Sequence, residues 1–389
     1  MSIVGGKYTI FATFPRGIMD ALNTTDVLNS TVNGTLGNVN FGGSMLASFV
    51  LFVLAVIPIY VGSILSQRCC DQTRMEILTS RDAMHFPVYA SFALFGIYIL
   101  FKFVPKEYIN LIVNLHFSAL GTFSMATVFA PLLRGCFPRS MKNYLFKLEF
   151  SQDEQTETEG GETVMKPISK SSLEFSSKDF VGFAVALSIG IWYLITRHWI
   201  ANNFIGVTLS VLAIECIRLN KFTNGCLLLG GLFFYDIFWV FGTPVMVSVA
   251  KTLDAPIKVT FPRDFLTHGV FGTQLALLGL GDIVVPGIFV AMLLRFDYRL
   301  NRNGSQVYFY TGYAAYIVGL LTTFVVMHVF QAAQPALLYL VPTCLGFPFI
   351  LALIRGDLAA MISYEDVPEK AVEDQQTSHA ILDTTKKNT

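Results

Sequence analysis

The sequence predicts an all-α polytopic membrane protein with about nine transmembrane helices. Hydrophobic residues make up 53% of the 389 residues and charged residues only 14%, and the mean hydropathy is +0.56. This composition lies outside the range of soluble domains. Apolar stretches long enough to cross a bilayer also recur along the chain. Inside lipid, backbone polar groups must be paired within the chain, and a helix of roughly 20 apolar residues achieves this.

The helices can be placed in order along the chain. The first follows a polar tail of more than forty residues, so it does not read as a cleavable signal peptide. The fourth and fifth are separated by almost no loop, because only Arg197 and His198 lie between them. The expected spans are 45–65, 86–104, 108–133, 180–196, 199–217, 223–250, 269–294, 307–330 and 335–354.

The two tails predict the orientation of the helices. "NTTDVLNSTVNGT" contains glycosylation sequons at Asn23, Asn29 and Asn33, which favour a lumenal, glycosylated N-terminus over a chance richness in Asn and Thr. The chain ends in "KKNT", where Lys386 and Lys387 look like a dilysine signal for return to the endoplasmic reticulum from a cytosolic C-terminus. An odd number of spans joins these two ends, and the distribution of Lys and Arg agrees with this topology.

We expect four regions along the chain. They are the lumenal tail 1–43, helices one to five in 44–222, helices six to nine in 223–354 and the cytosolic tail 355–389. An acidic cytosolic loop at about 134–178 is expected to be a solvated, partly disordered linker. Lys plus Arg and Asp plus Glu are equal at 27 each, so the charge balance predicts no nucleic-acid partner. The cysteine spacing predicts no disulfide framework or zinc site, and we expect no metal or cofactor.

Two aspartates stand out within the late spans. Asp236 is the only carboxylate in 223–250, and Asp282 is the only charged residue in 269–294. Each lies near the middle of its expected span, and consecutive spans are antiparallel, so the two side chains should reach the same membrane depth. A charge at a helix centre costs ~2.5 to 3.5 kcal/mol on insertion scales, so we expect both residues to have a function.

A pair of facing carboxylates has a specific chemical use. Because one negative charge opposes the other, the pair tends to share one proton. One carboxylate can then accept a proton from water while the other donates one to a peptide carbonyl, as in aspartic proteases. Intramembrane acids also serve as proton relays in transporters and cation channels. That alternative stays open on the aspartates alone, as does a non-catalytic membrane adaptor.

Residues next to the aspartates suit an active site. Tyr235 provides a hydroxyl beside Asp236. In "GLGD", we expect Gly279 to share a helical face with Asp282, and the small residues Gly279 and Gly281 around Leu280 to leave room for a partner helix or a substrate.

A third motif follows in "QAAQPALLYLVP". Gln334 precedes Pro335, which can open a helix because its missing N–H is not needed there. An ordinary helix entrance is one interpretation. The other is that Pro335, Ala336 and Leu337 form an irregular stretch at the active site, which membranes tolerate only where protein or water covers it. Such an edge could pair with a substrate strand.

Together, "YD" (235–236), "GLGD" (279–282) and "QPALLYL" (334–340) resemble the intramembrane aspartyl proteases, the family that contains presenilin and signal peptide peptidase. Five further stretches are similar to the signal peptide peptidase group, and the likeness runs from about residue 44 to 366. They are "TSRDAMHFP" (79–87), "HWIANN" (198–203), "APIKVTFP" (255–262), "PGIFVAMLLRFD" (286–297) and "MISYED" (361–366).

The resemblance implies a nine-helix protease of the endoplasmic reticulum. Its substrates would be remnant signal peptides and type II membrane proteins, whose spanning segment has its N-terminal end in the cytosol. It implies that Asp236 and Asp282 are the catalytic residues and that Pro335, Ala336 and Leu337 form the Pro-Ala-Leu element. We expect membrane-embedded substrates and the lipid bilayer as partners, and a homo-oligomer or a quality-control complex of the endoplasmic reticulum as possible assemblies.

Overall fold

The computed structural model describes residues 41–68, 76–134, 144–157, 163–176, 179–300, 304–330 and 334–366. The predicted glycosylation sites Asn23, Asn29 and Asn33 and the retrieval residues Lys386 and Lys387 lie outside these ranges. Within them the chain is mostly helical, and eight helices are long and apolar enough to cross a membrane. This agrees with a polytopic membrane protein, while the count of nine and the orientation of the ends remain predictions.

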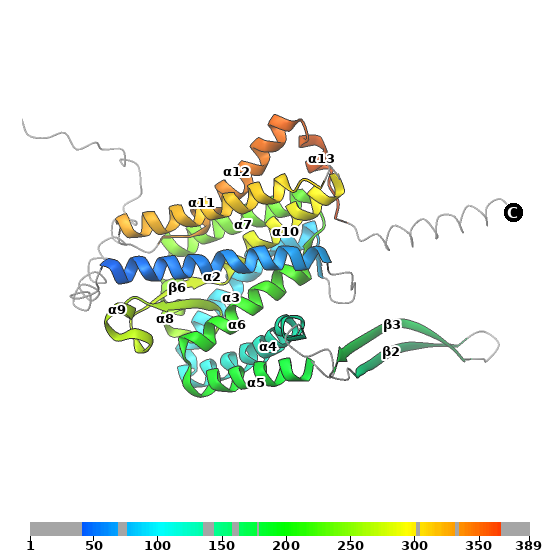
Figure 1. The fold of residues 1–389 in the computed structure, drawn as a ribbon, viewed down its shortest axis with the longest axis horizontal. Coiled ribbons are helices and arrows are strands. Elements are labelled where there is room, and N and C mark those ends of the chain that lie inside the picture. Colours follow the sequence, from blue (N-terminus) through cyan, green and yellow to red (C-terminus); the bar gives the residue numbers. More distant parts are fainter. Residues whose placement is uncertain are drawn as a thin grey trace, which may run out of the picture. The chain divides into compact units, whose positions relative to one another are not determined.

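The eight candidate spans follow the predicted order (Figure 1). They are α2 (Phe41–Arg68), α3 (Ser80–Phe103), α4 (Lys106–Arg134), α5 (Asp179–Thr196), α6 (Trp199–Cys216), α7 (Phe222–Phe241), α11 (Val307–Phe330) and α12 (Leu337–Arg355). A further long helix, α10 (Gly281–Leu300), carries Arg295, Asp297 and Arg299 in its second half. These charges keep α10 out of the apolar set, although most of its side chains are buried in the protein.

Two predicted spans are wrong in their extent. The span 223–250 is broken, because α7 ends at Phe241 and the separate helix α8 (Val245–Thr252) follows. Pro244 explains the break, since its ring removes a hydrogen bond and clashes with the preceding turn. The span 269–294 becomes helical only at Gly281. Helix α9 (Phe265–His268) lies before this span and runs into a 3-10 turn at its start (Gly269–Phe271), and strand β6 (Leu275–Gly279) follows.

The described residues are mostly helical, but the all-α prediction missed three two-stranded sheets among them. β1 (Glu76–Leu78) pairs in parallel with β4 (Ile217–Leu219), and β5 (Lys258–Pro262) pairs with β6. Short apolar runs such as "LALLG" do not distinguish a strand from a helix by periodicity, which explains the error.

The acidic loop, which we expected to be a solvated, partly disordered linker, contains two strands in its described part. β2 (Leu145–Glu157) and β3 (Thr163–Ser176) form an antiparallel hairpin with an irregularity between Gln152 and Asp153. Their register places Phe146 opposite Phe175 and Leu148 opposite Leu173.

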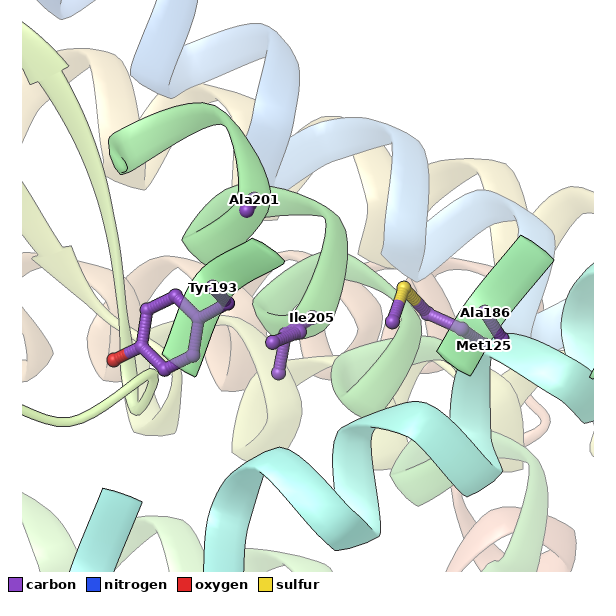
Figure 2. Close-up of a cluster of buried hydrophobic side chains, with 5 residues drawn as sticks. All are labelled: Met125, Ala186, Tyr193, Ala201 and Ile205. Carbon is purple, nitrogen blue, oxygen red and sulfur yellow. The ribbon is translucent and has the colours of Figure 1, made fainter. Parts of the chain in front are cut away.

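A buried cluster joins α4, α5 and α6 (Figure 2). Met125, Ala186, Tyr193, Ala201 and Ile205 are at most 2% exposed. The Tyr193 hydroxyl donates a hydrogen bond of 2.8 Å to Asn114 Oδ1, which satisfies the buried phenol. Close approach of these helices depends on small residues, since a Cβ on Gly121 would clash with Ile205.

A buried ion pair fixes the last described segment, which contains "MISYED". Arg295 Nε lies 2.6 Å from Asp366 Oδ2, and both side chains are less than a tenth exposed. Arg295 Nη1 also donates to the Ser66 hydroxyl over 2.7 Å, and the Tyr364 hydroxyl donates to Asp366 Oδ1 over 3.3 Å. This network therefore connects α2, α10 and the segment after α12.

The contacts divide the chain into two units, 1–47 with 262–276, and 48–261 with 277–389. In the described part of the smaller unit, Gly43 of α2 lies so close to the Arg263 carbonyl that a Cβ would clash with it. All the residues of the candidate site lie in the larger unit. The four regions predicted from the sequence are defined by topology and function, and this division does not test them.

Candidate active site

Asp236 lies in the C-terminal third of α7 and is 5% exposed. It is not at the middle of a long span, because α7 ends before Pro244. Its Oδ2 accepts a hydrogen bond of 3.0 Å from the backbone N–H of Leu337. Leu337 is the first helical residue of α12, where backbone N–H groups have no partner within the helix and attract negative charge. The start of α12 therefore holds and orients one oxygen of this carboxylate.

Asp282 is the second residue of α10 and is partly buried. The prediction that it lies at the centre of a span is wrong, but the two aspartates still come together. α7 contacts α10, and the Asp236 and Asp282 carboxylates lie close enough for their charges to influence each other, with no hydrogen bond between them among the described residues. The two aspartates therefore lie near helix ends: Asp282 at the start of α10 and Asp236 near the end of α7.

We predicted that Gly279 of "GLGD" shares a helical face with Asp282. This prediction is wrong, because Gly279 does not lie in a helix. Gly279 ends β6, Leu280 forms a turn and Gly281 begins α10. A Cβ on Gly279 would contact Asp282 Oδ2 at an ordinary 3.5 Å, and one on Gly281 would meet no described atom within 4 Å. The motif is thus not used for close helix packing, and the space beside Gly281 is open to another molecule.

The Pro-Ala-Leu element has features of both predicted structures, the helix entrance and the irregular stretch at the active site. Gln334, Pro335 and Ala336 lie outside the helix, and α12 begins at Leu337. The Pro335 carbonyl accepts the Leu338 N–H over 3.3 Å, and Gln334 Oε1 accepts a 3.3 Å hydrogen bond from the Tyr339 hydroxyl. The element is therefore a helix entrance, and its first free N–H binds Asp236.

Tyr235 packs beside Trp239 on α7. Its ring packs against Trp239 with centroids 6.3 Å apart, and the Trp239 indole donates to the Ser91 hydroxyl over 3.1 Å. Its hydroxyl interacts with Asp236 electrostatically, but in the described ranges no hydrogen bond joins them. Adjacent helix positions are rotated by about 100°, which explains why neighbours in sequence face different surroundings.

The sequence analysis missed Tyr316 on α11, which is fully buried. Its hydroxyl has no hydrogen-bond partner among the described residues, and it interacts electrostatically with Asp282. Gly312 and Gly319 lie one turn to either side. A Cβ on either glycine would clash, with Leu293 of α10 or with Thr343 of α12, respectively. "GYAAYIVG" carried a signal for this packing in its glycine spacing, but none for the proximity of Tyr316 to Asp282.

Comparison with known proteins gives the family. The family model described as signal peptide peptidase matches residues 70–368. The signal peptide peptidases of Mus musculus and Homo sapiens are each 46% identical to the chain over 328 residues, covering 83% of this chain and 84% of theirs. Intramembrane protease 2 of Caenorhabditis elegans is 34% identical over 445 residues, covering 88% and 94%. The length and strength of these matches show that the chain belongs to the signal peptide peptidase family.

Proposed function

We propose that the protein is an intramembrane aspartyl protease that hydrolyses peptide bonds within membrane-embedded segments. The observation that carries the proposal is the Asp236–Asp282 pair, together with the Leu337 N–H that orients one of its carboxylates. Paired carboxylates in one site can act as acid and base on the same carbonyl. The family membership and the names of the relatives support the same chemistry.

The mechanism uses water as the nucleophile. One aspartate, ionised, takes a proton from water as the water oxygen bonds to the peptide carbonyl carbon. The other, protonated, gives its proton to the carbonyl oxygen, so that a tetrahedral diol forms. The diol collapses when the C–N bond breaks: the protonated aspartate gives its proton to the leaving nitrogen, the ionised aspartate takes a proton from a diol hydroxyl, and the pair again shares one proton. The Leu337 N–H keeps Asp236 aimed at the carbonyl throughout.

The surroundings of Asp282 support binding of an unwound substrate. Within the described residues β6 is paired on one edge only, and Leu277 on this strand is 52% exposed. An extended peptide can add to such an edge through backbone hydrogen bonds. We propose remnant signal peptides and type II membrane segments as the substrates, entering from the bilayer.

We further propose that the protein resides in the membrane of the endoplasmic reticulum. The sequons at Asn23, Asn29 and Asn33 and the lysines Lys386 and Lys387 support this location and a lumenal N-terminus. Removal of N-linked glycans should increase the gel mobility of the protein, and replacing all three asparagines by Gln should abolish that change. A glycan-free wild-type protein in cells would contradict the lumenal assignment.

Cleavage of a labelled signal peptide by the purified protein tests the activity. We expect cleavage by the wild type and none by Asp236→Ala or Asp282→Ala. If the protein were a transporter or channel, it should instead conduct protons or cations in proteoliposomes. If it were a non-catalytic adaptor, its biological effect should survive the loss of both aspartates. The similar proteins support neither hypothesis. Cleavage that persists in Asp282→Ala would contradict the proposed mechanism.

A further inference from the structure

Two adjacent asparagines of α6 hold one edge of strand β5. The Asn203 amide donates to the Thr260 carbonyl over 2.7 Å, and Asn203 Oδ1 accepts the Thr260 N–H over 2.8 Å. The Asn202 amide donates to the Lys258 carbonyl over 2.7 Å. Lys258 and Thr260 are two residues apart, so these groups lie on the same edge of the strand. Both asparagines are buried. Their side chains thus make the hydrogen bonds to this edge of β5 that a neighbouring strand would otherwise make.

The opposite edge of β5 leads to Asp282. β5 pairs with β6, and β6 ends at Gly279, three residues before Asp282. Just after β6, the Leu280 N–H donates to the Ile257 carbonyl over 3.0 Å. A series of hydrogen bonds therefore runs from the Asn202 and Asn203 side chains of α6, through the backbone of β5, to the N–H of Leu280, the turn residue two positions before Asp282.

The same face of α6 also receives the side chain of Leu280. Gly206 follows Asn202 and Asn203 by one helical turn, so the three residues lie on one face. A Cβ on Gly206 would lie 3.3 Å from Leu280 Cδ2 and 3.4 Å from Val259 Cγ1. The side chains of Leu280 and Val259 thus pack against the α6 backbone at Gly206. α6 therefore contacts the turn residue that lies two positions before Asp282.

We propose that Asn202 and Asn203 are positioning residues for cleavage, which set the place of Asp282 relative to Asp236 through the β5–β6 hairpin. The proposal rests on the aspartyl protease function proposed above. Asp236 is placed independently, by the Leu337 N–H. The two halves of the catalytic pair therefore have separate anchors, and a shift of about 1 Å between reacting groups can cost 100-fold in rate.

An amide is the side chain that suits this role. Asn203 meets both the N–H and the C=O of Thr260, which requires a donor and an acceptor side by side. Leucine has a similar shape but neither group. Asn203→Leu therefore removes both hydrogen bonds, leaves two backbone groups of β5 without this partner, and preserves most of the packing volume.

The test compares purified full-length variants in cleavage of one labelled, membrane-embedded signal peptide. We expect Asn203→Leu to lower kcat roughly 10- to 100-fold while KM stays within about threefold of wild type. Mass spectrometry of the products should show cleavage spreading to neighbouring bonds. Asn114→Leu is the matched control, because Asn114 is also a buried asparagine but bonds Tyr193, away from the hairpin. This control should keep the wild-type cleavage sites.

Wild-type kcat and cleavage sites in Asn203→Leu would overturn the proposal, as would the same spread of sites in Asn114→Leu. If Asn203→Leu does not fold, Gly206→Ala provides the test, because its Cβ pushes Leu280 by a few tenths of an ångström and keeps the hydrogen bonds. Its control is Gly96→Ala, where a Cβ meets no described atom within 4 Å. Gly206→Ala must lower kcat relative to Gly96→Ala, and equal rates would refute the role.

Failure of the proposed function gives a different pattern. If the wild type does not cut the peptide, or if Asp282→Ala cuts it, the aspartyl mechanism is wrong and the positioning role falls with it. If the wild type cuts and Asp282→Ala does not, the mechanism stands, and the Asn203 and Gly206 variants decide the positioning role alone.

Discussion

The buried Arg295–Asp366 ion pair allows a quantitative test of the packing described here. The two side chains are 7% and 9% exposed and 2.6 Å apart, and Arg295 also bonds Ser66. Arg295→Met retains much of the side-chain volume but leaves Asp366 as a buried charge without its cation. Breaking a buried pair from one side typically costs ~3 to 5 kcal/mol. We expect the free energy of unfolding to fall by that amount.

Titration with a denaturing detergent, followed by circular dichroism, measures the loss. The double variant Arg295→Met with Asp366→Asn removes both charges and should recover on the order of 1 to 3 kcal/mol relative to the sum of the single losses. Full stability in Arg295→Met, or strict additivity in the double variant, would refute the assignment of a stabilising buried pair.

Two further predictions concern α11. Gly319→Ala should lower the free energy of unfolding by ~1 to 3 kcal/mol, because its Cβ would clash with Thr343. Gly346→Ala is the control, because a Cβ there meets no described atom within 4 Å. Equal melting temperatures of the two variants would contradict the prediction. The Tyr316 hydroxyl has no hydrogen-bond partner among the described residues, and we predict that it donates to the reacting groups only during cleavage. Tyr316→Phe should then slow signal-peptide cleavage about tenfold, the value of one hydrogen bond of ~1.5 kcal/mol formed in the transition state, without loss of thermal stability. An unchanged rate would exclude Tyr316 from the reaction at Asp282.

Much of the helical framework could be predicted from apolar length alone. The eight candidate spans appear where the sequence predicted a helix, because backbone pairing in lipid leaves few other structures. The failures lie at 223–250 and 269–294, next to the candidate site. The sequence analysis treated 223–250 as one helix despite Pro244, and neither hydropathy nor periodicity predicts that an apolar run such as β6 pairs as a strand with β5.

The pairing of the two aspartates was predicted from a wrong premise. We placed both at span centres, whereas the structure places Asp282 at the start of α10 and Asp236 near the end of α7. The prediction rested on the cost of an acid in lipid, which depends on the depth of the side chain in the bilayer and does not require a position at the centre of a helix. The Leu337 N–H and the Asn203 contacts to Thr260 could not be predicted, because they join residues 101 and 57 positions apart through the tertiary fold.

The central claim is that Asp236 and Asp282 act together on one peptide carbonyl. Binding of a peptide in which a hydroxyethylene group replaces the scissile amide tests it most directly, because transition-state analogues bind roughly 10²- to 10⁸-fold more tightly than substrates. We expect one molecule to bind per wild-type chain, and the affinity to fall at least about 100-fold in Asp236→Asn and in Asp282→Asn alike. Equal affinity in either folded variant would contradict a shared catalytic site.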